Sequence, residues 1–80
     1  MSMNLSELVI GQYATIQEFT DIEMSVKLME MGCLPGETVQ LIKIAPFGDP
    51  ISIAVAGYEL SLRRKEASTV LVNILQWAKA

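Results

Sequence analysis

The chain has 80 residues, 51% of them hydrophobic, and a formal net charge of −3. A chain of this length can form only one thin core, so we expect a single domain over residues 1–80. The apolar content excludes a disordered linker. The acidic balance argues against nucleic-acid binding, which needs a basic face. Every apolar run is far shorter than the roughly twenty residues of a membrane-spanning helix, so we expect no insertion into a membrane.

The mean hydropathy of +0.38 is high for so short a chain. It predicts that some apolar surface stays exposed after folding and meets a partner. Cys33 is the only cysteine, so no intrachain disulfide can form. The N-terminus lacks the basic and apolar regions of a signal peptide. We therefore expect a free-standing cytoplasmic protein.

The first expected elements precede residue 20. Residues 1–10 form a leader in which Leu5 and Leu8 lie three positions apart, as one helical turn would place them. Residues 12–19 are expected to form the first strand, with Ala14 and Ile16 on one face.

A helix is expected over residues 21–31. Thr20 and Glu23 fit a capping box, in which each side chain accepts a hydrogen bond from the backbone N–H of the other residue. Gly32 suits the left-handed position that ends a helix, and Pro35 prevents the helix from resuming.

The apolar residues of this helix form two stripes on nearly opposite sides. One stripe consists of Ile22, Val26 and Met29. The other consists of Met24, Leu28 and Met31. One stripe can pack on a sheet, and the other needs a second surface, supplied by this chain or by a partner.

Four further strands are expected after the helix. Val39 and Leu41 have one parity but Ile42 and Ile44 have the other, which predicts a bulge in the strand. Residues 46–50 form a loop before the next strand.

The following two strands alternate cleanly over residues 51–55 and 58–62, with a tight hairpin at Ala56-Gly57. In the second of these strands, the side chains expected to point inward are Tyr58, Leu60 and Leu62. Residues 64–68 allow one helical turn before a last strand through Val70, Val72 and Ile74. Residues 75–80 form a C-terminal tail. Five short, closely linked strands with a bulge predict a small β-barrel.

The sequence offers little for catalysis. Histidine is absent, which removes the commonest general base and metal ligand. Cys33 lies at a helix end with no histidine to activate it, so we interpret it as a small buried hydrophobe. The carboxylates are dispersed, and no glycine-rich phosphate loop follows a strand. We therefore expect no catalytic residue, no metal ligand and no cofactor.

Two segments go beyond generic turn chemistry. They are residues 28–37, LMEMGCLPGE, and residues 45–51, APFGDPI, the latter followed by Leu60-Ser61-Leu62-Arg63. The structural turn residues are Gly32, Pro35, Gly36, Pro46, Gly48, Asp49, Pro50 and, in the hairpin, Gly57. In this order and spacing the motifs resemble the FeoA family, small cytoplasmic proteins of bacterial ferrous-iron uptake. The resemblance runs from about Leu5 to Ile74. Cys33 departs from it, and Trp77 lies outside it.

This resemblance implies an SH3-like β-barrel of about five strands with a helix inserted between the first two. It implies association with FeoB, the membrane transporter whose cytoplasmic part includes a GTP-binding domain. It also implies a supporting or regulating role in ferrous-iron transport, without catalysis.

A docking surface is expected to combine the second helix stripe, a loop aromatic and the basic run, namely Met24, Leu28, Met31, Phe47, Arg63 and Arg64. Flexible methionine side chains suit such a surface. The same stripe is also a common core pattern, and a basic run is often a solvated strand end, so both interpretations stay open.

Two other functions fit the sequence. One is an SH3-like regulatory domain related to those of metal-dependent transcriptional repressors, although the chain has no helix-turn-helix of its own. The other is a regulator that binds ferrous iron or another metal ion directly. Weak self-association through the same apolar surface is a further expectation.

Overall fold

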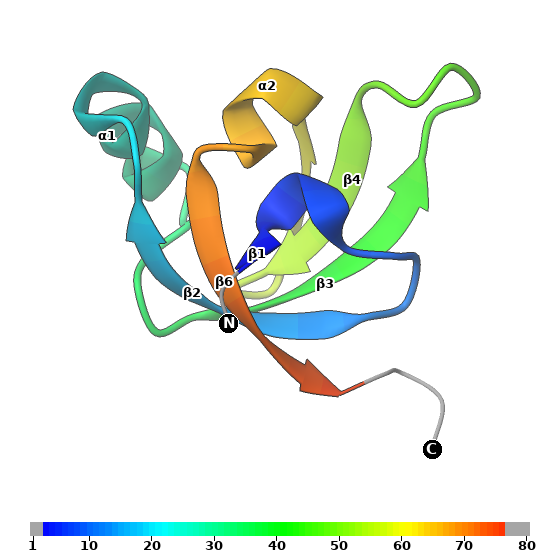
Figure 1. The fold of residues 1–80 in the computed structure, drawn as a ribbon, viewed down its shortest axis with the longest axis horizontal. Helices are drawn as coiled ribbons and strands as arrows, with labels where there is room; N and C mark the ends of the chain where they lie inside the picture. Colours follow the sequence, from blue (N-terminus) through cyan, green and yellow to red (C-terminus); the bar gives the residue numbers. More distant parts are fainter. Residues whose placement is uncertain (1–2, 77–80) are drawn as a thin grey trace.

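The computed structural model describes residues 3–76, and these residues form one curled antiparallel sheet with three short helical segments (Figure 1). The strands are β1 (Met3–Asn4), β2 (Tyr13–Phe19), β3 (Thr38–Ile44), β4 (Ile51–Val55), β5 (Tyr58–Leu62) and β6 (Val70–Gln76). The helical segments are η1 (Leu5–Glu7), α1 (Ile22–Glu30) and α2 (Arg64–Ala67). Within residues 3–76 no helix is long and apolar enough to span a bilayer.

The strands follow the spatial order β1-β6-β2-β3-β4-β5. The five strands expected from sequence are all present, and α1 lies between β2 and β3, as the resemblance implied. The sixth strand, β1, was not predicted. It consists of Met3 and Asn4, which pair with Val72 and Leu71 of β6, and two residues are too few to show alternation.

Register shifts bend the sheet into a curl. The pairing of β2 with β6 shifts between Ile16 and Glu18, and the pairing of β3 with β4 shifts between Leu41 and Lys43. The second shift confirms the bulge predicted from the change of parity in residues 39–44. A bulge adds a residue to one strand and increases the local twist, so the inner face closes around the core.

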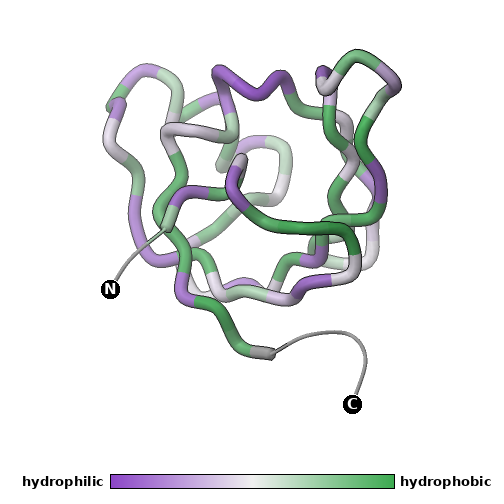
Figure 2. Tube along the Cα trace, turned by 45° about the vertical axis from the view of Figure 1, so that its right-hand side comes forward, coloured by the Kyte–Doolittle hydropathy of each residue, from purple (hydrophilic) through white to green (hydrophobic). Residues whose placement is uncertain are grey.

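The core lies inside this curl. Figure 2 shows hydrophobic stretches along the strands, interrupted by hydrophilic residues. The buried apolar residues of the strands are Ala14, Ile16, Val39, Leu41, Ile51, Ile53, Val55, Leu62, Val70 and Val72. Leu5 and Leu8 of the leader are also buried, which confirms the helical turn expected there. Tyr58 is 69% exposed, so its predicted inward position is wrong. It lies on the edge strand β5, directly after the hairpin and opposite Val55.

The helix α1 begins one residue later than predicted. Its N-cap is Asp21, whose Oδ1 accepts a hydrogen bond from the backbone N–H of Met24 at 3.0 Å. The predicted capping box of Thr20 and Glu23 is wrong. The backbone N–H of Thr20 donates to the carbonyl oxygen of Thr69 at 2.8 Å, so Thr20 is bonded to the segment that precedes β6, next to the last pair of β2 and β6.

The helix buries the stripe that we had expected to serve as the docking surface. Leu28 is fully buried, and Met24 and Met31 are partly buried against the core. The exposed stripe consists of Ile22 (85% exposed), Val26 (53%) and Met29 (36%). The expectation of a docking role for Leu28 is therefore wrong, and the apolar surface left over on this helix lies on its opposite side.

Because Leu28 is buried and Val26 is exposed, truncating the two side chains should lower the free energy of unfolding by unequal amounts. Leu28→Ala should lower the free energy of unfolding by about 2–5 kcal/mol, because it opens a cavity in the core. Val26→Ala should change it by less than about 0.5 kcal/mol, because Val26 is exposed. Urea unfolding of both variants measures the difference. Equal costs would contradict the burial of Leu28.

Candidate partner-binding surface

The C-terminus of α1 explains why Leu28 points inward. The backbone N–H of Cys33 donates to the Leu28 carbonyl at 3.0 Å, and the N–H of Gly32 donates to the Met29 carbonyl at 3.0 Å. With Gly32 at φ 106°, this pair of bonds is a Schellman motif. In that motif the residue after the glycine and the third helical residue from the end approach each other as an apolar pair. Cys33 and Leu28 hold these two positions, and both are fully buried.

The spacing of Leu28, Gly32 and Cys33 in the sequence was therefore a signal for which face of α1 is buried. In a helix that ends at Gly32, the apolar residues at positions 28 and 33 face the core together. The expectation of Cys33 as a small buried hydrophobe is confirmed. Burial also raises the pKa of its thiol, which keeps the side chain in the neutral form.

The chain returns from α1 to the sheet through a turn over residues 34–37. The backbone N–H of Glu37 donates to the Leu34 carbonyl at 3.0 Å. Pro35 and Gly36, at φ 92°, hold the two central positions of this type II turn. Ile16 of β2 fixes it, because the Gly36 N–H donates to the Ile16 carbonyl at 2.8 Å and the Ile16 N–H donates to the Glu37 carbonyl at 2.9 Å. The orientation of α1 is thereby tied to β2.

Acidic side chains flank the exposed stripe of α1. Helical spacing places Glu23 and Glu30 together along one side of the stripe of Ile22, Val26 and Met29. Lys27 lies on the same flank, and its Nζ is 2.7 Å from Oε2 of Glu66 in α2. The resulting face is apolar along its centre and acidic at its edge.

The ion pair between Lys27 and Glu66 links the two helices. The Lys27 ammonium and the backbone N–H of Arg63 both donate to the Glu66 carboxylate, and they hold its pKa below the ordinary value of 4.5. A lowered folded-state pKa contributes stability that is present above the unfolded-state pKa. This stability is lost as the pH falls through the folded-state pKa.

Stability should therefore fall as the pH drops below about 4.5, with Glu66 contributing to the loss. The Glu66→Gln variant should be less stable than the wild type at pH 7, and the difference should shrink toward pH 3. Chemical unfolding at a series of pH values measures it. A constant difference across this range would contradict the assignment.

The loop between β3 and β4 presents a further exposed apolar side chain. Phe47 is 98% exposed. The loop has a defined turn, because the Gly48 N–H donates to the Ala45 carbonyl at 2.7 Å and Gly48 has φ 89°. The peptide bond between Asp49 and Pro50 is cis. In Figure 1 this loop and α1 lie on opposite sides of α2.

Arg64 holds this loop against the N-terminal segment. Its Nε donates to the Gly48 carbonyl at 2.6 Å, and its Nη1 donates to the Ser6 carbonyl at 2.8 Å. Its backbone N–H donates to Oδ1 of Asp49 at 3.0 Å. Arg64 was expected at the rim of the docking surface, but its guanidinium is half-buried and already bonded to backbone. Arg63 is exposed, as expected.

Arg64→Ala should lower the free energy of unfolding by about 1.5–3 kcal/mol, because two backbone carbonyls lose a charged donor. Arg64→Lys should not restore it, since one ammonium cannot reproduce the fork geometry. Arg63→Ala, one residue away and exposed, is the control and should cost less than about 0.5 kcal/mol. Amide exchange at Gly48 should accelerate in both Arg64 variants. An unchanged rate would show that Arg64 does not order the loop.

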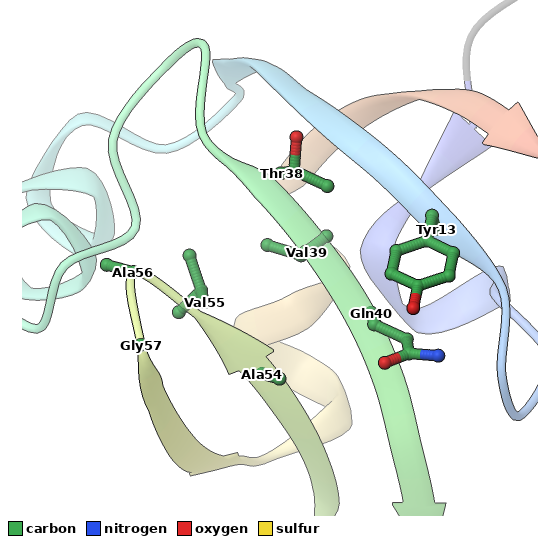
Figure 3. Close-up of a pocket in the computed structure, with 8 residues that line it drawn as sticks. All are labelled: Tyr13, Thr38, Val39, Gln40, Ala54, Val55, Ala56 and Gly57. Carbon is green, nitrogen blue, oxygen red and sulfur yellow. The ribbon is translucent and has the colours of Figure 1, made fainter. Parts of the chain in front are cut away.

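A shallow cavity of about 160 Å³ lies on the outer side of the sheet, over β2, β3 and β4 (Figure 3). Its lining includes Tyr13, Gln40, Ala54 and Gly57. The polar side chains there are Tyr13, Thr38 and Gln40, and Nε2 of Gln40 donates to the Gly11 carbonyl at 3.2 Å. Small-molecule sites usually measure roughly 300 Å³ or more. This cavity is large enough for one side chain of a partner.

In the part of the chain that the structure describes, no group of three or more His, Cys, Asp or Glu residues is arranged to hold a metal ion. Trp77, whose role the sequence left open, lies outside the described residues.

The curled antiparallel sheet, with a helical turn between its last two strands, places the protein in the SH3-like class of small barrels. The protein-family model described as the FeoA domain matches residues 3–74 of this chain. The chain belongs to the FeoA family.

Three relatives illustrate this. The Fe(2+) transport protein A/Fe(2+) transporter FeoB fusion protein of Porphyromonas gingivalis is 34% identical over 74 residues, which are 91% of this chain. This chain spans only 9% of that fusion protein. A FeoA-like protein from Clostridium acetobutylicum is 33% identical, over 92% of this chain and 87% of that chain, with a TM-score of 0.87. The Stenotrophomonas maltophilia FeoA, an SH3 domain protein complexed with zinc, is 30% identical over 89% of each chain, with a TM-score of 0.78.

A manganese-dependent transcriptional repressor has the same fold, with a TM-score of 0.84 over 92% of this chain and 37% of that chain. Its sequence identity is 19%, so the likeness concerns the fold alone.

Proposed function

We propose that this protein is a non-catalytic cytoplasmic accessory protein of ferrous-iron uptake that binds the cytoplasmic GTP-binding region of a FeoB transporter. The observation that carries the proposal is the fusion protein of Porphyromonas gingivalis, in which a segment 34% identical to this chain belongs to the same polypeptide as FeoB. Covalent linkage keeps two domains at high effective concentration, so fusion is typical of domains that act on each other.

The surface of the protein supports binding to a partner. Ile22 and Phe47 are 85% and 98% exposed, although each is a large apolar side chain. Both belong to segments held by hydrogen bonds, so little conformational entropy is lost when a partner covers them. Phe47 and Arg63, on the two segments that the hydrogen bond from Arg64 to Gly48 joins, remain part of the proposed docking surface.

The two alternative functions have less support. The likeness to a manganese-dependent repressor concerns the fold, at 19% identity. The zinc complex belongs to a relative that is 30% identical. In residues 3–76 the single cysteine is buried with a raised thiol pKa, which disfavours the thiolate that binds metal.

Binding of the full-length chain to the purified cytoplasmic region of FeoB from the same organism tests the proposal. We expect a saturable titration with a dissociation constant in the micromolar range or below. Titrations with GDP and with a GTP analogue separate two roles. A regulator should bind the two nucleotide states with different affinities, whereas a scaffold should bind them equally. Absence of binding in every nucleotide state would refute the proposed function.

A further inference from the structure

The exposed stripe of α1, consisting of Ile22, Val26 and Met29, is the largest apolar feature on any helix of residues 3–76. The three residues recur at the spacing i, i+4, i+7 and so form a continuous ridge on one face of the helix. The opposite face already packs on the core through Leu28. Folding of this domain therefore does not require the ridge.

Bonds at both ends fix the extent of α1, and the buried Leu28 and the turn bonded to Ile16 attach the helix to the body of the protein. Asp21 caps its start, and the Schellman motif at Gly32 closes its end. Between them Lys27 is paired with Glu66 of α2 at 2.7 Å. A helix held in this way presents its ridge in a fixed orientation, which lowers the entropy cost of binding.

The charges beside the ridge select its partner. Glu23 and Glu30 lie along one flank, and the described residues supply no ion pair to either. Lys27 shares the flank, but its charge is compensated by Glu66. We propose that this face binds a helix or extended segment of a partner protein in which apolar side chains are flanked by lysine or arginine. The inference rests on the proposed function and adds to it a docking face on α1.

The same charges argue against two other occupants. A second copy of the chain, packed ridge to ridge, would bring Glu23 and Glu30 of both copies to one interface, and like charges there are unfavourable. A bilayer with anionic headgroups would repel the acidic flank, because such surfaces attract basic segments. A partner with basic side chains is attracted by the same Glu23 and Glu30 carboxylates that disfavour a second copy or an anionic bilayer.

The test compares variants in the titration against the cytoplasmic region of FeoB. Ile22→Gln/Val26→Gln removes the centre of the ridge at exposed positions and should raise the dissociation constant at least tenfold. Tyr58→Gln is the matched control, because Tyr58 is a large exposed side chain of β5, 69% exposed, and this variant should bind within twofold of the wild type. Circular dichroism and thermal unfolding establish that each variant is folded.

A charge-reversal variant tests the chemistry of the partner. Glu23→Lys/Glu30→Lys should weaken binding at least tenfold at low salt, and added salt should narrow this difference. Unchanged binding of both double variants, while the wild type binds, would overturn this docking face and leave the proposed function intact. Failure of the wild type to bind would overturn both. A wild-type dimer in light scattering that Ile22→Gln/Val26→Gln abolishes would identify a second copy as the occupant and overturn the basic partner.

Discussion

The curl of the β-sheet is the constraint on which the rest of the structure depends. A flat sheet of six short strands would leave one apolar face open, and three short helical segments could not cover it. The register shifts in β2 and β3 bend the sheet, so residues such as Ile16, Leu41 and Ile53 pack against one another. The helical segments then need only to cover the ends of the curl.

This arrangement leaves the connections between strands available for recognition. The strands form most of the core. The helix α1 adds one buried face, the loop after β3 adds one anchoring contact, and the other sides of both remain exposed. Both connections are fixed by hydrogen bonds, from Ile16 to the turn after α1 and from Arg64 to Gly48. Loops and connections on a rigid scaffold are where proteins usually place binding residues. The two surfaces differ in charge, because α1 carries Glu23 and Glu30 whereas α2 carries a basic run.

Local patterns predicted the elements well, since each rests on interactions between near neighbours. The parity change in residues 39–44 predicted the bulge, and Ala56-Gly57 predicted a two-residue hairpin, whose residues have φ 53° and 84°. The cap of α1 was misplaced, because Thr20 and Asp21 are both good caps and only the hydrogen bond from Thr20 to Thr69, just before β6, decides between them. The candidate site was harder to predict, since two apolar stripes by themselves do not show which one is buried, and only the pairing of Leu28 with Cys33 across Gly32 gave a local signal.

The sequence by itself determined a small curled β-domain, the position of its helix, the turns at Gly32 and Gly36 and the burial of Cys33. These follow from alternation, glycine geometry and the lack of ionic partners, all of which act over a few residues. Only the tertiary structure decided that no other segment of residues 3–76 covers Ile22 and Val26, and that Arg64 bonds to Gly48 and Ser6. The physical reason is that these choices depend on which surfaces of distant segments meet when the sheet curls, and no local pattern contains that information.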